Sequence, residues 1–375
     1  MNSKNKVGIL TYHTGYNYGA SLQAYALSTV INKMGISCEI INFETARFLA
    51  SREMFSRSPR RLKEFIKIIT RVPYLTQLKK RQALFDCYTN KHLPISKLYR
   101  EESDVIKNAS IYDCIICGSD QIWNLSQNDA PAANLLFYLN FPKKQKRVSY
   151  AASFGKWVKE APKYRDVIVP LLKNFDAVSV REHSGVEFLN SVGVDACITL
   201  DPTLLLDKED YDLICQKRLI EHPYVLLFSW SCGNEVVTAA KKIANILKLP
   251  LINITPPPRA LFSRITRKLD VGPCEFLSLI KYADFVVTDS FHGTAFSTNF
   301  EKSFVSIVSD NTPDPRMKSL LDQLQLSDHL VNTAEIDLEK ISKTDFEIVR
   351  NKKTVLRKAS LEFLENALAE FRKDK

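Results

Sequence analysis

Three side chains in this sequence have the chemistry to bind and activate a small anionic substrate: Arg181, His292 and Arg316. Each follows a predicted strand, at or near the start of a predicted helix. Two arginines can hold a carboxylate and a phosphate through paired hydrogen bonds. A histidine between them can donate or accept a proton near neutral pH. The set suits a small dianion that undergoes proton-coupled chemistry.

The histidine belongs to the stretch 284–294, which reads as a short β-branched strand, a tight polar turn and a helix. The pattern predicts that the strand stops at Asp289 and that the helix starts near Thr294. Open α/β sheets bind ligands outside the carboxyl ends of their strands, and helix N-termini attract anions. Taken alone, this stretch leaves a second interpretation open, in which His292 only caps a helix or packs under a loop.

Several other kinds of site are not indicated. The sequence has no Asp/His metal cluster, no nucleophile elbow around a serine and no Walker motif. Eight cysteines in 375 residues do not make a disulfide framework. Cys114 and Cys117 have two-residue spacing but lie in an apolar strand, where positions three apart face opposite sides. We therefore predict neither a metal nor a redox cofactor.

The composition is that of an ordinary globular protein, with 45% hydrophobic and 25% charged residues. A length of 375 residues suits two domains. The longest apolar runs are far shorter than a bilayer span. Residues 1–6 lead into a strand without an apolar signal segment, so we expect a cytoplasmic protein.

The net charge of +10 is concentrated in one segment. Residues 47–100 contain 14 Lys or Arg and 3 acidic residues, and the rest of the chain is close to neutral. A basic segment on a neutral body indicates an anionic partner met at one place. A phosphate-bearing substrate, an anionic membrane surface and nucleic acid all fit that description.

The elements that position these residues alternate as strand and helix. The first domain is predicted over 1–206, and its strands are expected at 7–11, 38–43, 112–117, 148–152, 177–180 and 196–200. The second domain is predicted over 207–344, with strands at 224–230, 251–255, 284–289 and 303–308. A charged helix near 345–372 is expected to pack back across a cleft between the domains. This rhythm predicts two doubly wound α/β domains.

Residues 47–107 interrupt that rhythm in the first domain. Leu62, Phe65, Ile66 and Ile69 recur at helical spacing among basic residues, which predicts a basic amphipathic helix. One interpretation is a solvated basic face over a packed apolar one. The more specific interpretation is that this helix docks to the membrane that holds the substrate, through Arg60, Arg61, Lys63 and Lys67.

Polar residues follow the strands of the first domain. Tyr16, Asn17, Tyr18 and Gly19 lie in the loop after the first strand, which lacks the spacing of a nucleotide fingerprint. Their hydroxyl and amide groups suit sugar hydroxyls, although ordinary loop packing is the alternative. Asp120, Gln121 and Ser153 follow later strands and would face the same crevice.

Blocks of sequence in this order resemble the polysaccharide pyruvyl transferase family along almost the full chain. The similar stretches are 17–27, 118–124, 149–155, 179–182, 200–203, 283–293 and the segment from Arg316 to Leu324. The resemblance implies two Rossmann-like lobes in a GT-B-like arrangement with the active site in the cleft. It also implies transfer of a pyruvyl group from phosphoenolpyruvate to two hydroxyls of one sugar, which forms a cyclic ketal and releases phosphate. Phosphoenolpyruvate is then a co-substrate, and no metal or redox cofactor is required.

On this resemblance, His292 is the acid or base, helped by Arg181. Donor contacts are assigned to Arg181, Ser290, Phe291, Gly293, Thr294 and Arg316, and acceptor contacts to Tyr16, Asn17, Tyr18, Gly19, Asp120, Gln121 and Ser153. The acceptor would be a sugar, in a polysaccharide or on a lipid carrier at the inner face of the membrane. Many family members carry an arginine two positions before the histidine, where this chain has Ser290.

Two other functions compete with this one. A GT-B glycosyltransferase that uses a nucleotide sugar would share the two lobes. A basic protein that binds nucleic acid or anionic lipid would explain the charge but would leave the polar strand ends without a role. We therefore expect no nucleic-acid partner.

Overall fold

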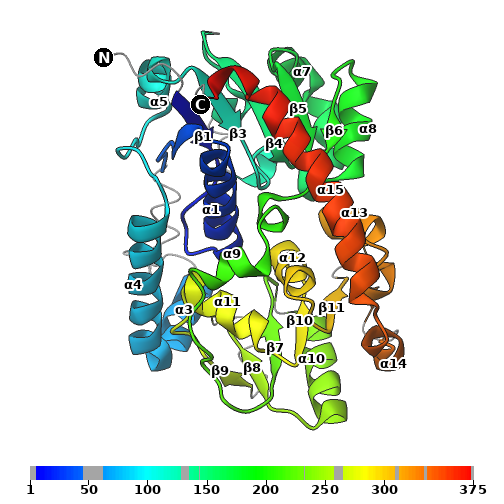
Figure 1. Cartoon of the computed structure of the whole chain (residues 1–375). Helices are drawn as coiled ribbons and strands as arrows, with labels where there is room; N and C mark the ends of the chain where they lie inside the picture. Colours follow the sequence, from blue (N-terminus) through cyan, green and yellow to red (C-terminus); the bar gives the residue numbers. More distant parts are fainter. Residues whose placement is uncertain are drawn as a thin grey trace. The chain divides into compact units, whose positions relative to one another are not determined.

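Two parallel β-sheets, one in each of two compact units, organise the chain (Figure 1). The computed structural model describes residues 6–44, 62–127, 135–142, 144–231, 233–256, 265–308, 312–332 and 336–372. Unit 1 is built from Met1–Phe48, Thr89–Leu206 and Asn351–Lys375, and unit 2 from Leu49–Tyr88 and Asp207–Arg350. The predicted pair of doubly wound α/β domains is confirmed in these two sheets.

The sheet of unit 1 has six parallel strands. They are β1 (Lys6–Leu10), β2 (Ser37–Ile40), β3 (Cys114–Cys117), β4 (Lys146–Ala152), β5 (Ala177–Val180) and β6 (Cys197–Ile198). Their order is β2-β1-β3-β4-β5-β6. Because successive strands are added on one side of β1 and then on the other, the carboxyl ends of β1 and β3 form the switch point where such sheets bind ligands.

Helices connect these strands. They are α1 (Tyr18–Lys33), α5 (Glu102–Asn108), α7 (Arg165–Leu172) and α8 (His183–Ser191). Asn17 starts α1, because its side-chain oxygen accepts the N–H groups of Gly19 at 3.0 Å and Ala20 at 3.4 Å. Helix α1 therefore starts at Tyr18, so Tyr18 and Gly19 belong to the helix and not to the loop in which the sequence analysis placed them.

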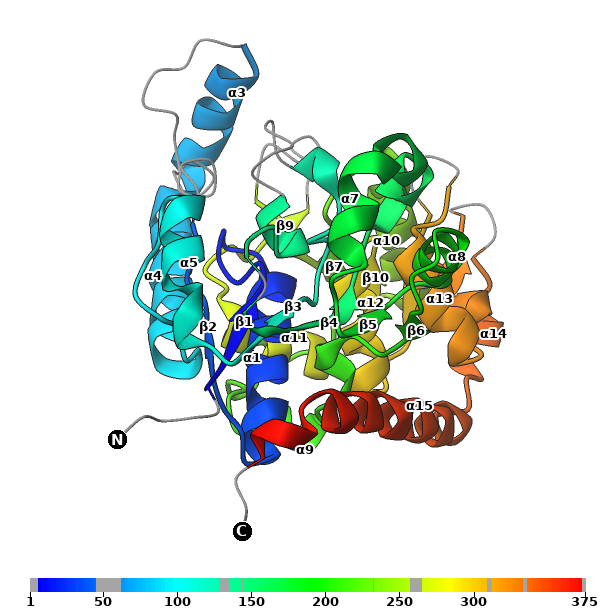
Figure 2. The same cartoon turned by 90° about the horizontal axis from the view of Figure 1, so that it is seen from above.

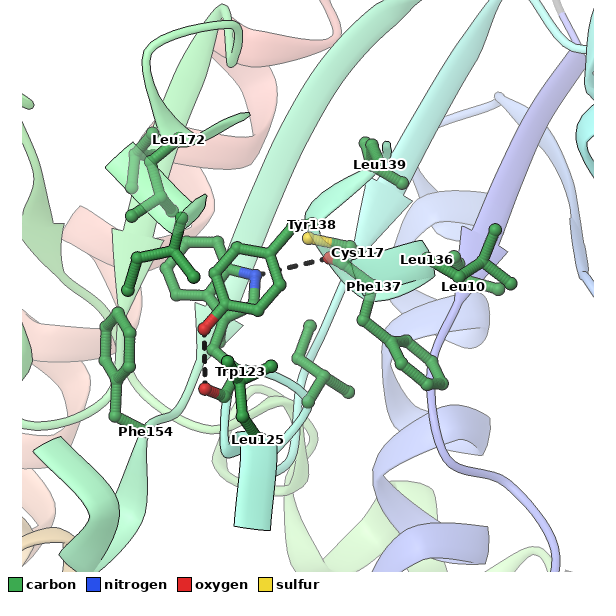
Figure 3. Packing of buried hydrophobic residues seen from close by; sticks show 14 of the residues in the cluster. Leu10, Cys117, Trp123, Leu125, Leu136, Phe137, Tyr138, Leu139, Phe154 and Leu172 are labelled. Carbon is green, nitrogen blue, oxygen red and sulfur yellow. Dashed lines mark hydrogen bonds between the residues drawn. The ribbon is translucent and has the colours of Figure 1, made fainter. Parts of the chain in front are cut away.

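The core of unit 1 is centred on Trp123, which is wholly buried (Figure 3). Its indole N–H donates to the carbonyl of Phe137 at 3.2 Å, and its own carbonyl accepts the Tyr138 hydroxyl at 2.6 Å. Aromatic rings pack around it, with Tyr138 stacked at 5.7 Å and Phe154 tilted at 5.2 Å between centroids. The turn that follows β3 is thus held in place by its packing against a large apolar cluster.

The sheet of unit 2 also has six parallel strands. They are β7 (Val225–Phe228), β8 (Leu251–Asn253), β9 (Thr266–Arg267), β10 (Phe285–Thr288), β11 (Phe304–Ile307) and β12 (Leu330–Val331). The order β12-β11-β10-β7-β8-β9 is that of a dinucleotide-binding fold, with its switch point between β7 and β10. The predicted strand at 224–230 is shorter than expected, because β7 ends at Phe228.

The helices of unit 2 are α3 (Leu62–Arg71), α9 (Lys208–Asp212), α10 (Asn234–Leu247), α11 (Pro273–Lys281), α12 (Phe291–Asn299), α13 (Pro315–Gln323) and α14 (Leu338–Ser342). Helix α10 shows how they pack. Its buried residues Val236, Ala239, Ala240 and Ile243 recur at helical spacing and join the apolar cluster of the sheet. Over the described residues, the structure has no helix long and apolar enough to span a membrane.

Leu49–Tyr88, the larger part of the basic helical excursion, belongs to unit 2, whereas the sequence analysis assigned the whole excursion to the first domain. Helix α4 (Leu75–His92) follows α3, as Figure 2 shows, and contacts residues 269–272 of unit 2. Lys80 is paired with Asp270 at 2.9 Å, and Gln77 accepts the Leu269 N–H at 2.9 Å. These partners lie about 190 positions away along the chain, so the local sequence pattern carried no sign of them. Arg60 and Arg61 lie outside the described residues, as do the side chains of Lys63 and Lys67.

The long helix α15 (Phe346–Ala367) begins in unit 2 and belongs to unit 1 from Asn351 onward. Within unit 1, its Ser360 hydroxyl accepts the Leu200 N–H at 2.9 Å, and Phe363 lies against Tyr150. Beyond it, Glu370 pairs with Lys146 at 2.8 Å. That this helix crosses a cleft between the domains stays a prediction.

Candidate functional site

The histidine of the predicted site lies in the first turn of α12, at the carboxyl end of β10. Ser290 caps this helix, because its hydroxyl accepts the Gly293 N–H at 3.5 Å. The backbone N–H of Ser290 in turn donates to the Thr288 hydroxyl at 3.0 Å. The helix therefore starts at Phe291, three residues before the predicted start. His292 is part of it and is only 6% exposed.

The start of α12 is packed closely against two strands. A Cβ atom at Gly293 would lie 2.2 Å from the Thr288 Oγ1 atom on β10 and 3.1 Å from a ring carbon of Phe228 on β7. A larger residue at this position would therefore force Thr288 or the helix to shift. Thr294 is also buried, and its hydroxyl shares a 2.6 Å hydrogen bond with that of Ser306. These contacts fix the position of His292 relative to the sheet.

Arg316 is in the first turn of α13 and lies against the start of α12. Its guanidinium is held by Asp314, through Nε to Oδ1 at 2.8 Å and Nη2 to Oδ2 at 2.6 Å. Its Cζ atom lies 5.5 Å from the centre of the Phe291 ring, and that ring is 5.2 Å from the His292 imidazole. The structure thus brings together His292, Arg316 and the residues from Ser290 to Thr294 in unit 2. Arg181, which the sequence analysis also assigned to the donor, lies in unit 1.

Asp289, which the sequence analysis treated only as the end of a strand, organises the neighbouring loop. Its carboxylate accepts the Ser229 hydroxyl at 2.8 Å, the Trp230 N–H at 2.6 Å and the Ser231 N–H at 3.1 Å. The Ser231 hydroxyl donates to it as well. One side chain of the histidine stretch therefore holds the loop after β7, a role that local sequence could not reveal because about 60 residues separate the partners.

In unit 1, Arg181 is part of a buried ion-pair network. Its Nη1 donates to Asp201 at 2.6 Å and its Nη2 to Asp120 at 3.1 Å, and its side chain is 1% exposed. The Ser119 hydroxyl adds a 2.7 Å hydrogen bond to Asp201. Thr203 donates to the same carboxylate through its N–H and its hydroxyl. The charge of Arg181 is thus compensated by two carboxylates of its own chain, which favours a role in holding the strand ends together.

The turn that carries Asp120 has a backbone that suits glycine. Gly118 has a φ of +113°, and a Cβ atom there would lie 2.2 Å from the carbonyl oxygen of Tyr150.

Burial, and then the nearby Asp201 carboxylate, raises the pKa of Tyr150 well above its ordinary value. The Tyr150 hydroxyl, which donates to the Leu200 carbonyl at 2.9 Å, therefore remains a neutral donor.

The residues predicted for the acceptor side divide into two groups. Tyr18 and Ser153 are buried, and the Ser153 hydroxyl donates to Glu182 at 3.0 Å. Gly19 is buried as well, and Asn17 caps α1. Tyr16 and Gln121 remain partly exposed, after β1 and β3 respectively, at the switch point of the sheet. Of the predicted acceptor residues, these two are the ones best placed to contact a ligand.

No group of three or more His, Cys, Asp or Glu side chains arranged for a metal occurs among the residues that the structure describes.

Comparison with known proteins places these observations in context. A sequence model of the polysaccharide pyruvyl transferase family matches residues 17–311. No curated protein matches the chain in a sequence search.

Among solved structures, a putative UDP-N-acetylglucosamine 2-epimerase from Listeria monocytogenes is similar, with a TM-score of 0.52, 13% identity, and coverage of 95% of this chain and 91% of that one. The UDP-N-acetylglucosamine 2-epimerase from Rickettsia bellii has a TM-score of 0.51, 10% identity and 97% coverage of both chains. An α-glucosyltransferase in complex with UDP and DNA has a TM-score of 0.51 at 10% identity, over 96% and 95% of the two chains. At such identities the likeness concerns the fold, and it confirms the predicted GT-B-like class.

Proposed function

Because the chain belongs to the polysaccharide pyruvyl transferase family, we propose that it transfers a pyruvyl group from phosphoenolpyruvate to two hydroxyls of one sugar. The observation that carries the proposal is the grouping of His292 and Arg316 around the Phe291 ring, at the carboxyl end of β10. An imidazole, a guanidinium and a helix N-terminus in one place suit an anionic substrate that must accept a proton.

The chemistry needs one proton donor and two hydroxyl nucleophiles. His292 protonates the methylene carbon of phosphoenolpyruvate, which makes C2 electron-poor, and the first sugar hydroxyl adds to C2 and loses its proton to a base. The C2–O bond to phosphate then breaks, and phosphate leaves with that electron pair. The second hydroxyl attacks C2, closes the ketal and gives its proton to the phosphate. The products are a cyclic pyruvate ketal and inorganic phosphate.

Arg316 is the proposed cation for the donor. It stacks on Phe291, and Ser290 is a helix cap at the position where many family members have an arginine. Asp314 pairs with Nε and Nη2 of Arg316 and thereby holds the guanidinium in one orientation against the Phe291 ring. For Arg181 we propose a positioning role, because its two ion pairs already satisfy its charge. Tyr16 and Gln121 are proposed to contact the acceptor.

The test measures phosphate release from phosphoenolpyruvate with galactose-, mannose- and glucose-terminated acceptors, and detects the ketal methyl group by NMR. His292→Ala and His292→Gln should lower turnover by roughly 10²–10⁴-fold, the usual contribution of a positioned acid or base. His222→Ala is the matched control, since His222 lies in the same unit and is exposed. Full turnover by His292→Ala would remove this histidine from the mechanism, and a large fall in its melting temperature would assign it a structural role.

The similar fold of enzymes that handle UDP-sugars makes a nucleotide-sugar glycosyltransferase the second candidate. Its signature would be UDP release from a UDP-sugar in the same acceptor panel. Such turnover without any use of phosphoenolpyruvate would replace the proposal.

A further inference from the structure

Trp230 differs from the other tryptophans of the chain in its exposure to solvent. The sequence has three tryptophans; Trp123 is wholly buried, Trp157 is 7% exposed and Trp230 is 58% exposed. An indole is a large apolar group that usually supplies packing energy when it is buried. Trp230 leaves most of its surface in water, so its contribution to the core of unit 2 is small.

The loop that carries this indole is nevertheless fixed in place. Asp289 accepts the backbone N–H of Trp230 at 2.6 Å, and it also accepts hydrogen bonds from the residues on both sides, Ser229 and Ser231. Several bonds to one carboxylate hold this short segment against β10. An exposed aromatic ring on a fixed backbone presents a flat apolar face to a ligand at lower entropic cost than one on an unrestrained loop.

The position of the loop in the sheet points to a ligand as well. Trp230 comes two residues after β7 ends, and Asp289 directly follows β10. These strands are neighbours, and the strand order reverses between them. The carboxyl ends at such a switch point are where doubly wound sheets bind their ligands. The same edge of the sheet carries His292.

The charges around the loop indicate which kind of ligand fits. Residues 224–240 contain no Lys or Arg, and the guanidinium of Arg267 on β9 donates to the carbonyl of Thr255 at 2.9 Å. The carboxylate of Asp289 lies at the loop, and Glu235 is in the first turn of the following helix, α10. These acidic groups would repel an anionic ligand but would not repel an uncharged one. The cation Arg316, on α13, lies instead against the Phe291 ring of α12.

We propose that the exposed indole of Trp230 stacks on the apolar face of an uncharged pyranose ring, and that Asp289 is the positioning residue that holds the backbone of this loop in place. This extends the proposed function, on which it rests, by assigning the saccharide acceptor a binding subsite in unit 2. The donor would be bound near Arg316 and the sugar near Trp230, at one edge of the same sheet.

The binding test uses protein labelled with 5-fluorotryptophan, which gives one fluorine resonance for each tryptophan, and Trp230→Phe identifies the resonance of Trp230. Galacto-, manno- and gluco-oligosaccharides are titrated separately, and UMP is titrated as a nucleotide probe. At least one saccharide should shift the Trp230 resonance and leave those of Trp123 and Trp157 in place. A shift with UMP alone would assign the indole to a nucleobase, and no shift with any saccharide would equally overturn the proposal.

The kinetic test separates this inference from the proposed function. Trp230→Ala should raise the KM for the saccharide about tenfold and leave the KM for phosphoenolpyruvate unchanged, and Trp230→Phe should keep most of the affinity. Asp289→Asn should move the Trp230 resonance of the free protein and raise the same KM. Ile246→Ala, at an exposed position of α10, is the control.

Each possible failure has a distinct result. Turnover of phosphoenolpyruvate with an unchanged saccharide KM in Trp230→Ala would overturn the subsite and leave the proposed function intact. A saccharide-dependent shift of the Trp230 resonance in a protein that never uses phosphoenolpyruvate would support the subsite and refute the proposed function.

Discussion

Arg181 lies between two carboxylates, Asp120 and Asp201, in the interior of unit 1. Arginines at strand ends in α/β proteins often bind anionic ligands, and the sequence analysis assigned Arg181 to the donor for that reason. The structure gives its guanidinium intramolecular partners instead. Removal of one member of a buried ion pair is costly, because the remaining charge is left in a low-dielectric interior.

We therefore predict that Arg181→Ala lowers the free energy of unfolding by about 3–5 kcal/mol. Arg181→Lys should restore only part of this loss, since one ammonium cannot reach both carboxylates as a planar fork does. Urea unfolding followed by circular dichroism measures the change. Arg372→Ala is the matched control in the same unit, because Arg372 makes an exposed ion pair with Glu365 and should change stability by less than about 1 kcal/mol. An Arg181→Ala protein of normal stability that fails to bind phosphoenolpyruvate would return this residue to the donor site.

The pH dependence of stability should carry the signature of another buried residue, His329. Its ring nitrogens lie 2.9 Å from the Phe304 carbonyl and 2.8 Å from the Thr344 hydroxyl. Burial lowers the pKa of His329, against smaller raising effects of the Phe304 carbonyl and Asp328. Because the folded state binds this proton less well than the unfolded chain, the stabilising effect is complete above the ordinary pKa of about 6.5 and is lost as the pH falls below it.

Acidification from about pH 7.5 to 5 should accordingly lower the urea midpoint of the parent protein, and His329→Gln should reduce that slope. His92→Gln is a useful comparison, because burial also lowers the pKa of His92, but in unit 1. Identical slopes in the parent and in His329→Gln would show that His329 does not contribute.

At the scale of elements, helix α3 combines a basic sequence with exposed apolar side chains. Ile69 is 71% exposed, Ile66 is 41% exposed, and Val72 just beyond the helix is 57% exposed. An apolar face among Lys and Arg residues is typical of helices that lie in a membrane interface. Helix α4 ties this face to unit 2 through residues 269–272.

We predict that the protein binds vesicles containing anionic phosphatidylglycerol and that added salt weakens this binding. The double variant Ile66→Ser, Ile69→Ser should co-sediment less than the parent at the same salt concentration, because the apolar contribution is lost. Ile246→Ser removes an exposed apolar residue from a different helix and serves as the control. If the double variant binds these vesicles as well as the parent, α3 is not the membrane contact.

The strands and most helices could be predicted, because short β-branched runs and helical spacing are local signals. The features that could not be predicted depend on contacts between residues far apart in the sequence. The run that ends in Trp230 reads as a longer strand, but the Trp230 N–H is bonded to Asp289 and β7 stops at Phe228. Likewise, the partners of Arg181 lie 20 and 61 positions away. The predicted donor residues at 290–294 lie together because they are contiguous in the sequence, whereas the loop that Asp289 holds was missed.

At the scale of the whole molecule, the fold is shared with enzymes that act on UDP-sugars, so ligand selectivity is the decisive property. We predict that phosphoenolpyruvate raises the melting temperature of the protein and that UDP-N-acetylglucosamine does not. A ligand at about 100 times its Kd should stabilise the native state by about 2.7 kcal/mol. A thermal-shift panel provides the measurement, and His292→Ala and Arg316→Ala proteins test where the ligand binds. Stabilisation by UDP-N-acetylglucosamine alone would contradict the prediction.

The path of the chain through the two units also has a consequence for biosynthesis. Unit 2 ends at Arg350, whereas unit 1 still needs the segment from Asn351 onward, which supplies the Ser360, Phe363 and Glu370 contacts. Domains usually fold in the order in which the ribosome delivers them. Here the unit that begins first is completed last, so a nascent chain must keep the β4 and β6 side of its first sheet uncovered while the second unit forms. A chain that ended at residue 350 would therefore contain a complete second unit and an unfinished first one, and the exposed surface of the unfinished unit is what chaperones would bind.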